Sequence, residues 1–243
     1  MEKIQNYING DLVSPQSGNY FNNVSPVTGE VYSLISDSDE HDIDDAVKSA
    51  KEAFLSWSKL SKKQRYDHII HLADVVENHF EELVKAESKD NGKPEWLARS
   101  VDIPRASENF RFFATASLHF DSEIHEMDGK AINYTLRQPI GVAGCISPWN
   151  LPIYLLTWKI APALVSGNTV VAKPSEVTPM TSYIFSKICQ EANLPKGVIN
   201  IVHGHGNKAG DALSRHPDVP IISFTGGTAT GEKIAAIAAP MFK

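Results

Sequence analysis

A glycine-rich turn near the end of the chain has the residue types that bind a phosphate group. Phe224-Thr225-Gly226-Gly227-Thr228 joins an expected strand, residues 221–224, to an expected helix that runs through Ile237. Glycines at such a junction leave backbone N–H groups uncovered at the positive end of a helix, which favours an anion. A plain helix start punctuated by glycine is the alternative interpretation.

The same turn does not match the P-loop of nucleotide-hydrolysing proteins. Gly226 and Gly231 have the P-loop spacing, but Glu232 stands where the P-loop has its lysine. Lys233 comes one residue later, which turns it by roughly 100° on a helix. Ile234 stands in place of the metal-binding hydroxyl. We therefore reject nucleotide hydrolysis.

Two further polar motifs follow short apolar segments in the middle of the chain. Ser147-Pro148-Trp149-Asn150 follows Val142–Ile146, and Lys173-Pro174-Ser175-Glu176 follows Thr169–Ala172. Both apolar segments are rich in β-branched residues and are predicted to be buried strands. A helix over Tyr154–Val165 lies between them, so the sequence predicts a βαβ unit. Ligands bind beyond the carboxyl ends of such parallel strands, where both motifs fall.

Before this unit the sequence predicts a largely helical region. Asn9-Gly10 is a hairpin-turn signal. Asp39 opens one helix, and Ser61, with Gln64 completing a capping box, opens another that ends near Asn91. The other expected elements are strands at 7–8, 12–13 and 31–35, a helix at 95–118 that is broken or bent at Pro104, and a strand at 131–138.

After Glu176 helices and strands continue to alternate, which extends the parallel sheet. Thr178 and Pro179 are predicted to be the N-cap and first residue of a helix that ends near Asn193. The remaining expected elements are a strand at 198–202, a helical stretch at 206–216 and the strand at 221–224. Four sheet strands are therefore expected in an α/β fold.

Composition excludes several classes of protein. The chain has 243 residues, 42% of them hydrophobic, and a formal net charge of −6 with both signs mixed along its length. A nucleic-acid partner is not expected, because it requires a concentrated basic face. No signal-peptide core precedes the first strand, and no apolar run approaches the ~20 residues that cross a bilayer. Two cysteines make no disulfide framework, so we expect a cytoplasmic protein without membrane contact.

Three motifs together resemble signature blocks of the NAD(P)-dependent aldehyde dehydrogenases. They are Pro148–Pro152, Gly167–Glu176 and Phe224–Thr228, and they occur in that family's order and spacing. The resemblance extends from the N-terminus to Lys243. It implies the aldehyde dehydrogenase fold, with a parallel Rossmann-like sheet and flanking helices, of which this chain would be an incomplete N-terminal half.

The resemblance also implies how the chain is divided. Residues 1–243 would form the NAD-binding domain, with a helical part at 1–118, an oligomerisation strand region at 119–139 and a βαβ cofactor-binding part at 140–243. The catalytic domain, with its cysteine and glutamate, would lie further along. The full-length protein would be a homo-oligomer that uses the strand at 131–138.

The expected cofactor is NAD. The ordinary Gly-x-Gly-x-x-Gly fingerprint is missing after Ile146, as it is in the resembling family. By resemblance, Lys173 and Glu176 bind the adenosine ribose, and a carboxylate there repels the 2′-phosphate of NADP. A surface ion pair between these two residues is the alternative. The expected cofactor-binding residues are Ile146, Ser147, Pro148, Trp149, Lys173, Pro174, Ser175, Glu176, Gly206, Phe224, Thr225, Gly226 and Gly227.

The resemblance assigns one catalytic residue, Asn150. In that family the matching side-chain N–H donates to the oxyanion that forms when a cysteine attacks the aldehyde to give a thiohemiacetal. Such a donor lowers the barrier by roughly 3 kcal/mol. A turn asparagine that caps a helix is the alternative. Cys145 and Cys189 lie in predicted apolar elements and are expected to be core residues.

Two segments resemble the 2-aminomuconic and 2-hydroxymuconic semialdehyde dehydrogenases, whose substrates carry a carboxylate besides the aldehyde. They are Val101–Arg105 and Asn109–Ala114. By resemblance Arg105 holds that carboxylate, which an arginine fork fits bidentately. A salt bridge with Asp102 or a neighbour is the alternative. The expected function is NAD-dependent oxidation of a muconic-type semialdehyde to the acid; a truncated, inactive NAD-binding or interaction protein is the alternative.

No metal site is expected. His68 and His71 lie three residues apart on a predicted helix but have no evident third ligand. His203-Gly204-His205 lies in a loop after a strand.

Overall fold

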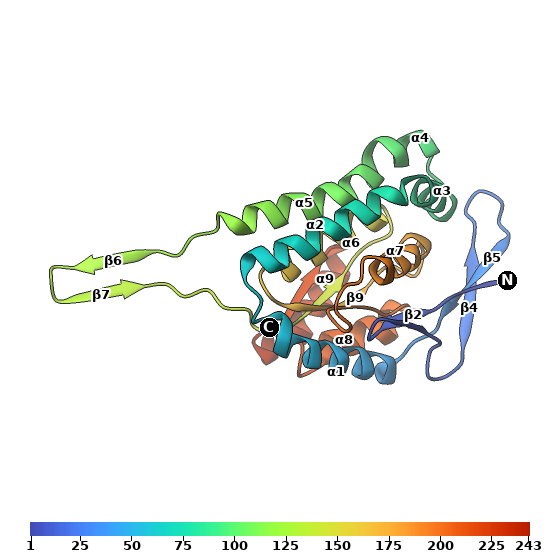
Figure 1. Ribbon diagram of the computed structural model, residues 1–243. Coiled ribbons are helices and arrows are strands. Elements are labelled where there is room, and N and C mark those ends of the chain that lie inside the picture. Colours follow the sequence, from blue (N-terminus) through green and yellow to red (C-terminus); the bar gives the residue numbers. More distant parts are fainter.

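A central sheet of six strands organises the molecule, and the computed structural model describes residues 1–243 (Figure 1). In spatial order the strands are β11 Ile221–Phe224, β8 Val142–Ile146, β9 Thr169–Lys173, β10 Ile199–Ile201, β2 Asn6–Ile8 and β3 Asp11–Val13. The first four run parallel, which confirms the expected parallel sheet. β2 joins β10 in the antiparallel direction, and the turn at Asn9-Gly10 leads into β3.

Helices cover both faces of this sheet. On one side lie α2 Lys62–Asn78, α5 Ile103–Leu118, α6 Pro152–Val165 and α7 Met180–Glu191; on the other lie α1 Glu40–Trp57 and α8 Asp211–Arg215. Val170 and Ala172 of β9 face the first core, whereas Val171 faces the second. Strands buried on both faces are apolar throughout, which explains the uninterrupted sequences of β8 and β9.

Capping side chains fix two helix starts as predicted. Asp39 and Ser61 each form a capping box, with Asp42 and Gln64 as the reciprocal partners. At α7 the N-cap is Pro179 rather than the expected Thr178. The carboxylate of Asp90 accepts a hydrogen bond from the Met180 N–H at 2.6 Å and takes the capping role there.

The long helix predicted from Ser61 to Asn91 is interrupted. α2 ends at Asn78, and α3 runs from Phe80 to Asn91. His79 separates them, with φ −94° and ψ 16°, and its ring contacts Glu82 at 2.9 Å and Glu191 at 2.7 Å. This break lets α3 pack against α7.

The helical stretch predicted at 95–118 is interrupted by a π-helical turn before Pro104, and not at Pro104 itself. α4 (Glu95–Leu97) leads into that turn at Ala98–Asp102, and α5 begins at Ile103, one residue before Pro104. Proline lacks an N–H group, which makes it compatible with a helix start.

Two smaller sheets are separate from the central sheet. β6 (Ile124–Met127) and β7 (Ala131–Tyr134) form a hairpin that projects far from the body (Figure 1). The strand predicted at 131–138 therefore ends four residues early. The other sheet combines β1 Glu2–Ile4, β5 Val31–Ser36 and β4 Tyr20–Val24, of which only β5 was predicted. No helix has the length and apolar character that a membrane span requires.

Candidate functional site

The sheet register brings the three sequence motifs to one edge. Ile146 at the end of β8 pairs with Lys173 in β9 and with Phe224 in β11. The segments that follow these residues therefore leave the sheet side by side at its carboxyl edge.

Lys173, Glu176 and Gly206 form a connected polar group at this edge. The Lys173 Nζ lies 2.6 Å from Glu176 Oε2, and the Gly206 N–H donates to Glu176 Oε1 at 3.2 Å. The predicted alternative, an ion pair, thus exists, but it is not a surface pair because Lys173 is 3% exposed. Residues 30 positions apart, Glu176 and Gly206, converge as the resemblance implied.

Burial is the largest influence on the pKa values of this pair. It lowers the pKa of Lys173, and the charge and hydrogen bond of Glu176 oppose it. Burial alone would raise the pKa of Glu176, but Lys173 and backbone N–H groups, including that of Gly206, outweigh it. The pKa of Glu176 is therefore below its ordinary value, and this carboxyl is ionised at neutral pH.

A cavity of about 430 Å³ opens beside this polar group. Ile146, Lys173 and Gly206 line it together with residues of α9 (Thr228–Ala238) and α8. Its volume lies within the range of small-ligand pockets, and its mixed apolar and polar lining suits a nucleoside. Sequence reasoning missed the lining residues of α9, although their helical spacing was visible: Thr230, Lys233, Ile234 and Ile237.

The glycine turn at the start of α9 is open to a ligand. A Cβ atom at Gly227 would meet nothing within 4 Å, and no side chain caps this helix. Gly227 has φ −68°, so the fold itself does not require glycine there. In contrast, a Cβ at Gly226 would lie 2.5 Å from the Phe224 ring. The free helix N-terminus fits the phosphate site predicted from the sequence.

The Ser147–Asn150 segment leaves the sheet edge toward solvent. Ser147 is buried and its Oγ has no hydrogen-bond partner, whereas Trp149 and Asn150 are exposed. Pro174 and Ser175, at the end of β9, lie between Lys173 and Glu176 and are buried or half-buried.

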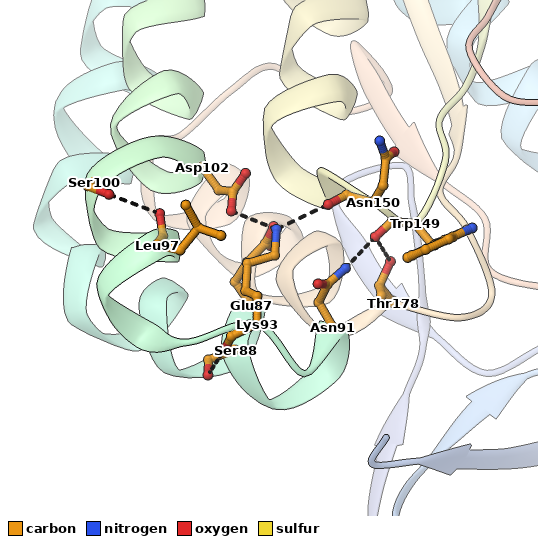
Figure 2. A network of polar contacts seen from close by, with 10 residues as sticks. All are labelled: Glu87, Ser88, Asn91, Lys93, Leu97, Ser100, Asp102, Trp149, Asn150 and Thr178. Carbon is orange, nitrogen blue, oxygen red and sulfur yellow. Dashed lines mark hydrogen bonds and ion pairs between the residues drawn. The ribbon is translucent and has the colours of Figure 1, made fainter. Parts of the chain in front are cut away.

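The Asn150 side chain makes no hydrogen bond, whereas its backbone carbonyl accepts one. Leu151 occupies the N-cap of α6 without a side-chain hydrogen bond, so the helix-capping alternative for Asn150 is wrong. The Lys93 Nζ donates to the Asn150 carbonyl at 3.1 Å, and the Asn91 side chain donates to the Trp149 carbonyl at 2.8 Å. Figure 2 shows the Asn150 amide directed away from both donors.

Arg105 lies on the exposed surface of α5. Its Nη1 pairs with Glu108 at 3.1 Å, whereas Asp102, the other partner considered from the sequence, binds Lys93 at 2.6 Å. Arg105 also borders a second cavity of about 430 Å³, which Trp158 helps to line. The structure does not place Arg105 in contact with the Lys173 group.

Both cysteines are core residues, as predicted. Cys145 and Cys189 are completely buried. Burial raises the pKa of both thiols, that of Cys145 to about 12, so neither is a thiolate at neutral pH.

One buried lysine of the site carried no sequence signal. Lys159 of α6 is 6% exposed, and its Nζ donates to Thr225 Oγ1 at 2.5 Å in the glycine turn. Burial lowers the pKa of Lys159. A single lysine within an apolar helix matches no motif, and only the folded sheet brings it beneath the turn.

The histidines show no metal-binding arrangement. His203 is buried, and its Nε2 has no hydrogen-bond partner. Burial, with the nearby charge of Lys173, lowers the pKa of His203 to about 3, so this ring is neutral at neutral pH. His68 packs against the Trp57 ring instead. No group of three or more His, Cys, Asp or Glu side chains could hold a metal ion.

Comparison with known proteins defines the class. The sequence profile of the aldehyde dehydrogenase family matches residues 12–243. The chain therefore belongs to the aldehyde dehydrogenase family.

Individual relatives are similar along nearly the whole chain. A 2-aminomuconic semialdehyde dehydrogenase from Danio rerio is 52% identical over 241 residues, covering 99% of this chain and 49% of that protein. A 2-hydroxymuconic semialdehyde dehydrogenase from Pseudomonas sp. (strain CF600) is 45% identical, covering 98% of this chain and 50% of that protein. The NAD⁺ complex of an aldehyde dehydrogenase from Bacillus cereus superposes with a TM-score of 0.97 at 39% identity, covering 100% of this chain and 50% of the other. This chain thus spans about half the length of the relatives it matches.

Proposed function

We propose that this chain forms the NAD-binding domain of a dehydrogenase that oxidises a muconic-type semialdehyde to the carboxylic acid. The observation that carries the proposal is the Lys173–Glu176–Gly206 group beside an open cavity at the carboxyl edge of a parallel sheet. Relatives named as semialdehyde dehydrogenases and a related structure in complex with NAD⁺ support the substrate class and the cofactor.

In this proposal the residues at the sheet edge hold NAD. Lys173 and the ionised Glu176 bind the adenosine ribose, and the uncapped N-terminus of α9 at Gly226-Gly227 binds the pyrophosphate. The carboxylate of Glu176 disfavours a 2′-phosphate, so NAD is preferred to NADP. When bound, NAD accepts the hydride that leaves the aldehyde carbon.

The substrate side of the proposal rests on Asn150 and Arg105. The free amide of Asn150 donates a hydrogen bond to the aldehyde oxygen as negative charge develops there. Arg105 exchanges its exposed partner Glu108 for the substrate carboxylate. Neither cysteine of residues 1–243 supplies the nucleophile in this proposal, because both are buried.

We also propose a division of labour along the chain. Residues 1–118 support the site, residues 119–139 mediate homo-oligomerisation and residues 140–243 bind the cofactor. The exposed apolar side chains of the β6–β7 hairpin support the second assignment. Two free, buried cysteines support a reducing, cytoplasmic location.

Titration calorimetry with NAD and NADP tests the proposal directly. We expect NAD to bind more tightly than NADP, and Glu176→Gln to weaken NAD binding by about tenfold, as expected for a charge-assisted hydrogen bond. Glu52→Gln is the matched control, because this exposed residue of α1 makes no polar side-chain contact in the site. Equal effects of the two substitutions, or no heat with NAD, would contradict the proposal.

A further inference from the structure

The turn at Asn91–Pro94 reaches the backbone of the Asn150 segment from a different part of the chain. Asn91 donates to the Trp149 carbonyl at 2.8 Å, and Lys93 donates to the Asn150 carbonyl at 3.1 Å. Two consecutive peptide units are therefore held by side chains almost 60 residues earlier in the sequence (Figure 2). The only other side-chain contact to the Trp149 carbonyl is that of Thr178, at 3.5 Å.

Lys93 is itself fixed by two buried carboxylates. Its side chain is 8% exposed, and its Nζ lies 2.6 Å from Asp102 Oδ2 and 3.4 Å from Glu87 Oε1. Those carboxylates come from the π-helical turn and from α3. The ammonium group is thus anchored on three sides, and the Asn150 carbonyl is one of them. All three N–H groups of the buried ammonium therefore have an acceptor, which holds the Asn150 carbonyl at a fixed place.

The conformation of the turn directs both donors toward the site. Gly92 between them has φ 79°, a left-handed conformation that glycine adopts without strain. The Asn91 side chain and the Lys93 ammonium then meet neighbouring carbonyls of the same strand-to-helix segment. At that segment α6 begins without a side-chain cap, so the helix start does not fix the backbone of Asn150.

We propose that Asn91 and Lys93 are positioning residues, which fix the backbone of Trp149 and Asn150 so that the free Asn150 amide meets the oxygen of the aldehyde. The inference rests on the role proposed for Asn150. A hydrogen-bond donor stabilises a developing charge best when it needs no reorganisation at the moment of reaction. Asn91 and Lys93 bind the backbone carbonyls of Trp149 and Asn150, so they fix this segment and leave the side-chain amide of Asn150 free to donate.

The test is the steady-state kinetics of the complete gene product. Asn91→Ala removes one neutral hydrogen bond and should fold, because Asn91 is partly exposed. We expect kcat to fall about tenfold or more, since small displacements of a catalytic group are costly, while KM for NAD and the melting temperature stay unchanged. Lys93→Met should lower kcat further but also destabilise the protein. Asn78→Ala and Lys85→Met are matched controls, because neither exposed side chain contacts the site.

The double variant Asn91→Ala/Asn150→Ala distinguishes a positioning role of Asn91 from a general loss of structure. If Asn91 acts through Asn150, Asn91→Ala should have little further effect on kcat once Asn150 is already alanine. Crystal structures of the wild type and of Asn91→Ala should show residues 149–150 displaced or disordered in the variant.

The outcomes distinguish the two proposals. If the wild type does not oxidise a muconic-type semialdehyde with NAD, the proposed function fails. A normal kcat in Asn150→Ala would overturn the role proposed for Asn150, and with it this inference, but not the proposed function. A large loss in Asn150→Ala, with additive effects or no effect of Asn91→Ala and Lys93→Met, would overturn the inference alone.

Discussion

The buried ammonium group of Lys93 contacts two buried carboxyl groups, those of Glu87 and Asp102. Burial is the main reason that the pKa of Glu87 is raised to about 7; Asp102 adds to the increase, and Lys93 opposes it. Glu87 therefore carries a proton below about pH 7, which leaves Lys93 paired with Asp102 alone. The positive charge of Lys93 and the negative charge of Asp102 sum to zero only while Glu87 is protonated.

The raised pKa of Glu87 makes stability fall as pH rises from about 4.5 to about 7. Over this window the unfolded chain has already released the proton that the folded chain keeps, and above it this contribution is constant. Glu87→Gln should remove this pH dependence of the unfolding free energy, which is on the order of 3 kcal/mol between about pH 4.5 and about pH 7. Urea unfolding of both proteins at several pH values measures the difference.

Asp90, whose pKa is also raised to about 7 by burial, changes stability in the same direction in both proteins. The difference between wild type and Glu87→Gln therefore isolates Glu87. Parallel stability profiles of the two proteins would contradict the protonated state assigned to it.

Arg105 gives the substrate prediction at the residue scale. In the complete enzyme, Arg105→Ala should raise KM for a carboxylate-bearing semialdehyde about tenfold or more, because a charge-assisted bond is lost, and should spare a neutral aldehyde. Glu108→Ala frees the same guanidinium and should not raise KM. An equal loss on both substrates would remove Arg105 from substrate recognition.

At this scale the sequence predicted which motif residues lie together, but it did not predict the buried residues that anchor them; the role of these motif residues in binding NAD stays a prediction. Lys173, Glu176 and Gly206 were identified and converge in the fold. Lys93 and Lys159 were not, because their significance lies in burial and in partners far along the chain. The sequence around a single lysine does not show whether its ammonium group is exposed to solvent or buried.

At the scale of elements, the two glycines before α9 have different roles. Gly227→Ala should leave the melting temperature unchanged, since its Cβ has open space, but should weaken NAD binding by about tenfold by covering the proposed phosphate site. Gly226→Ala should lower the melting temperature, because its Cβ would lie 2.5 Å from the Phe224 ring, which must move to make room. Thermal unfolding and NAD titration of both variants measure these two effects. If both variants lost the same NAD affinity and neither lost stability, the different roles assigned to Gly226 and Gly227 would be wrong.

Element boundaries show what local sequence could not provide. The strands of the βαβ unit and the caps at Asp39 and Ser61 depend on neighbouring residues and were predicted correctly. At the break between α2 and α3, His79 contacts Glu191, which is 112 positions away, and at the start of α7 the Met180 N–H donates to Asp90, which is 90 positions away. Such contacts exist only after the chain has folded.

At the scale of the whole molecule, the β6–β7 hairpin is the least buried part of the fold. All eight strand residues are exposed, among them Ile124, Met127, Ile132 and Tyr134. Apolar side chains gathered on a projecting hairpin favour association with another protein surface. This supports the oligomerisation role proposed for residues 119–139.

Ile132→Lys should therefore reduce self-association without unfolding the chain. Ile132 is 70% exposed, so the substitution removes little internal packing, and light scattering after gel filtration measures the molar mass. Val27→Lys, at an equally exposed site outside the hairpin, is the control. An unchanged molar mass in Ile132→Lys would contradict the role of the hairpin.

The antiparallel pairing of β2 with β10 has a consequence for how the protein is made and handled. The Asn6 side chain accepts a hydrogen bond from the His203 N–H at 2.8 Å, just before the loop that carries Gly206. Asn6 and His203 lie 197 positions apart, so this edge of the sheet can close only after both segments have been synthesised. Proteolytic removal of residues 1–8, or a bulky purification tag fused before them, would therefore disturb the cavity beside Lys173 without touching any residue that lines it.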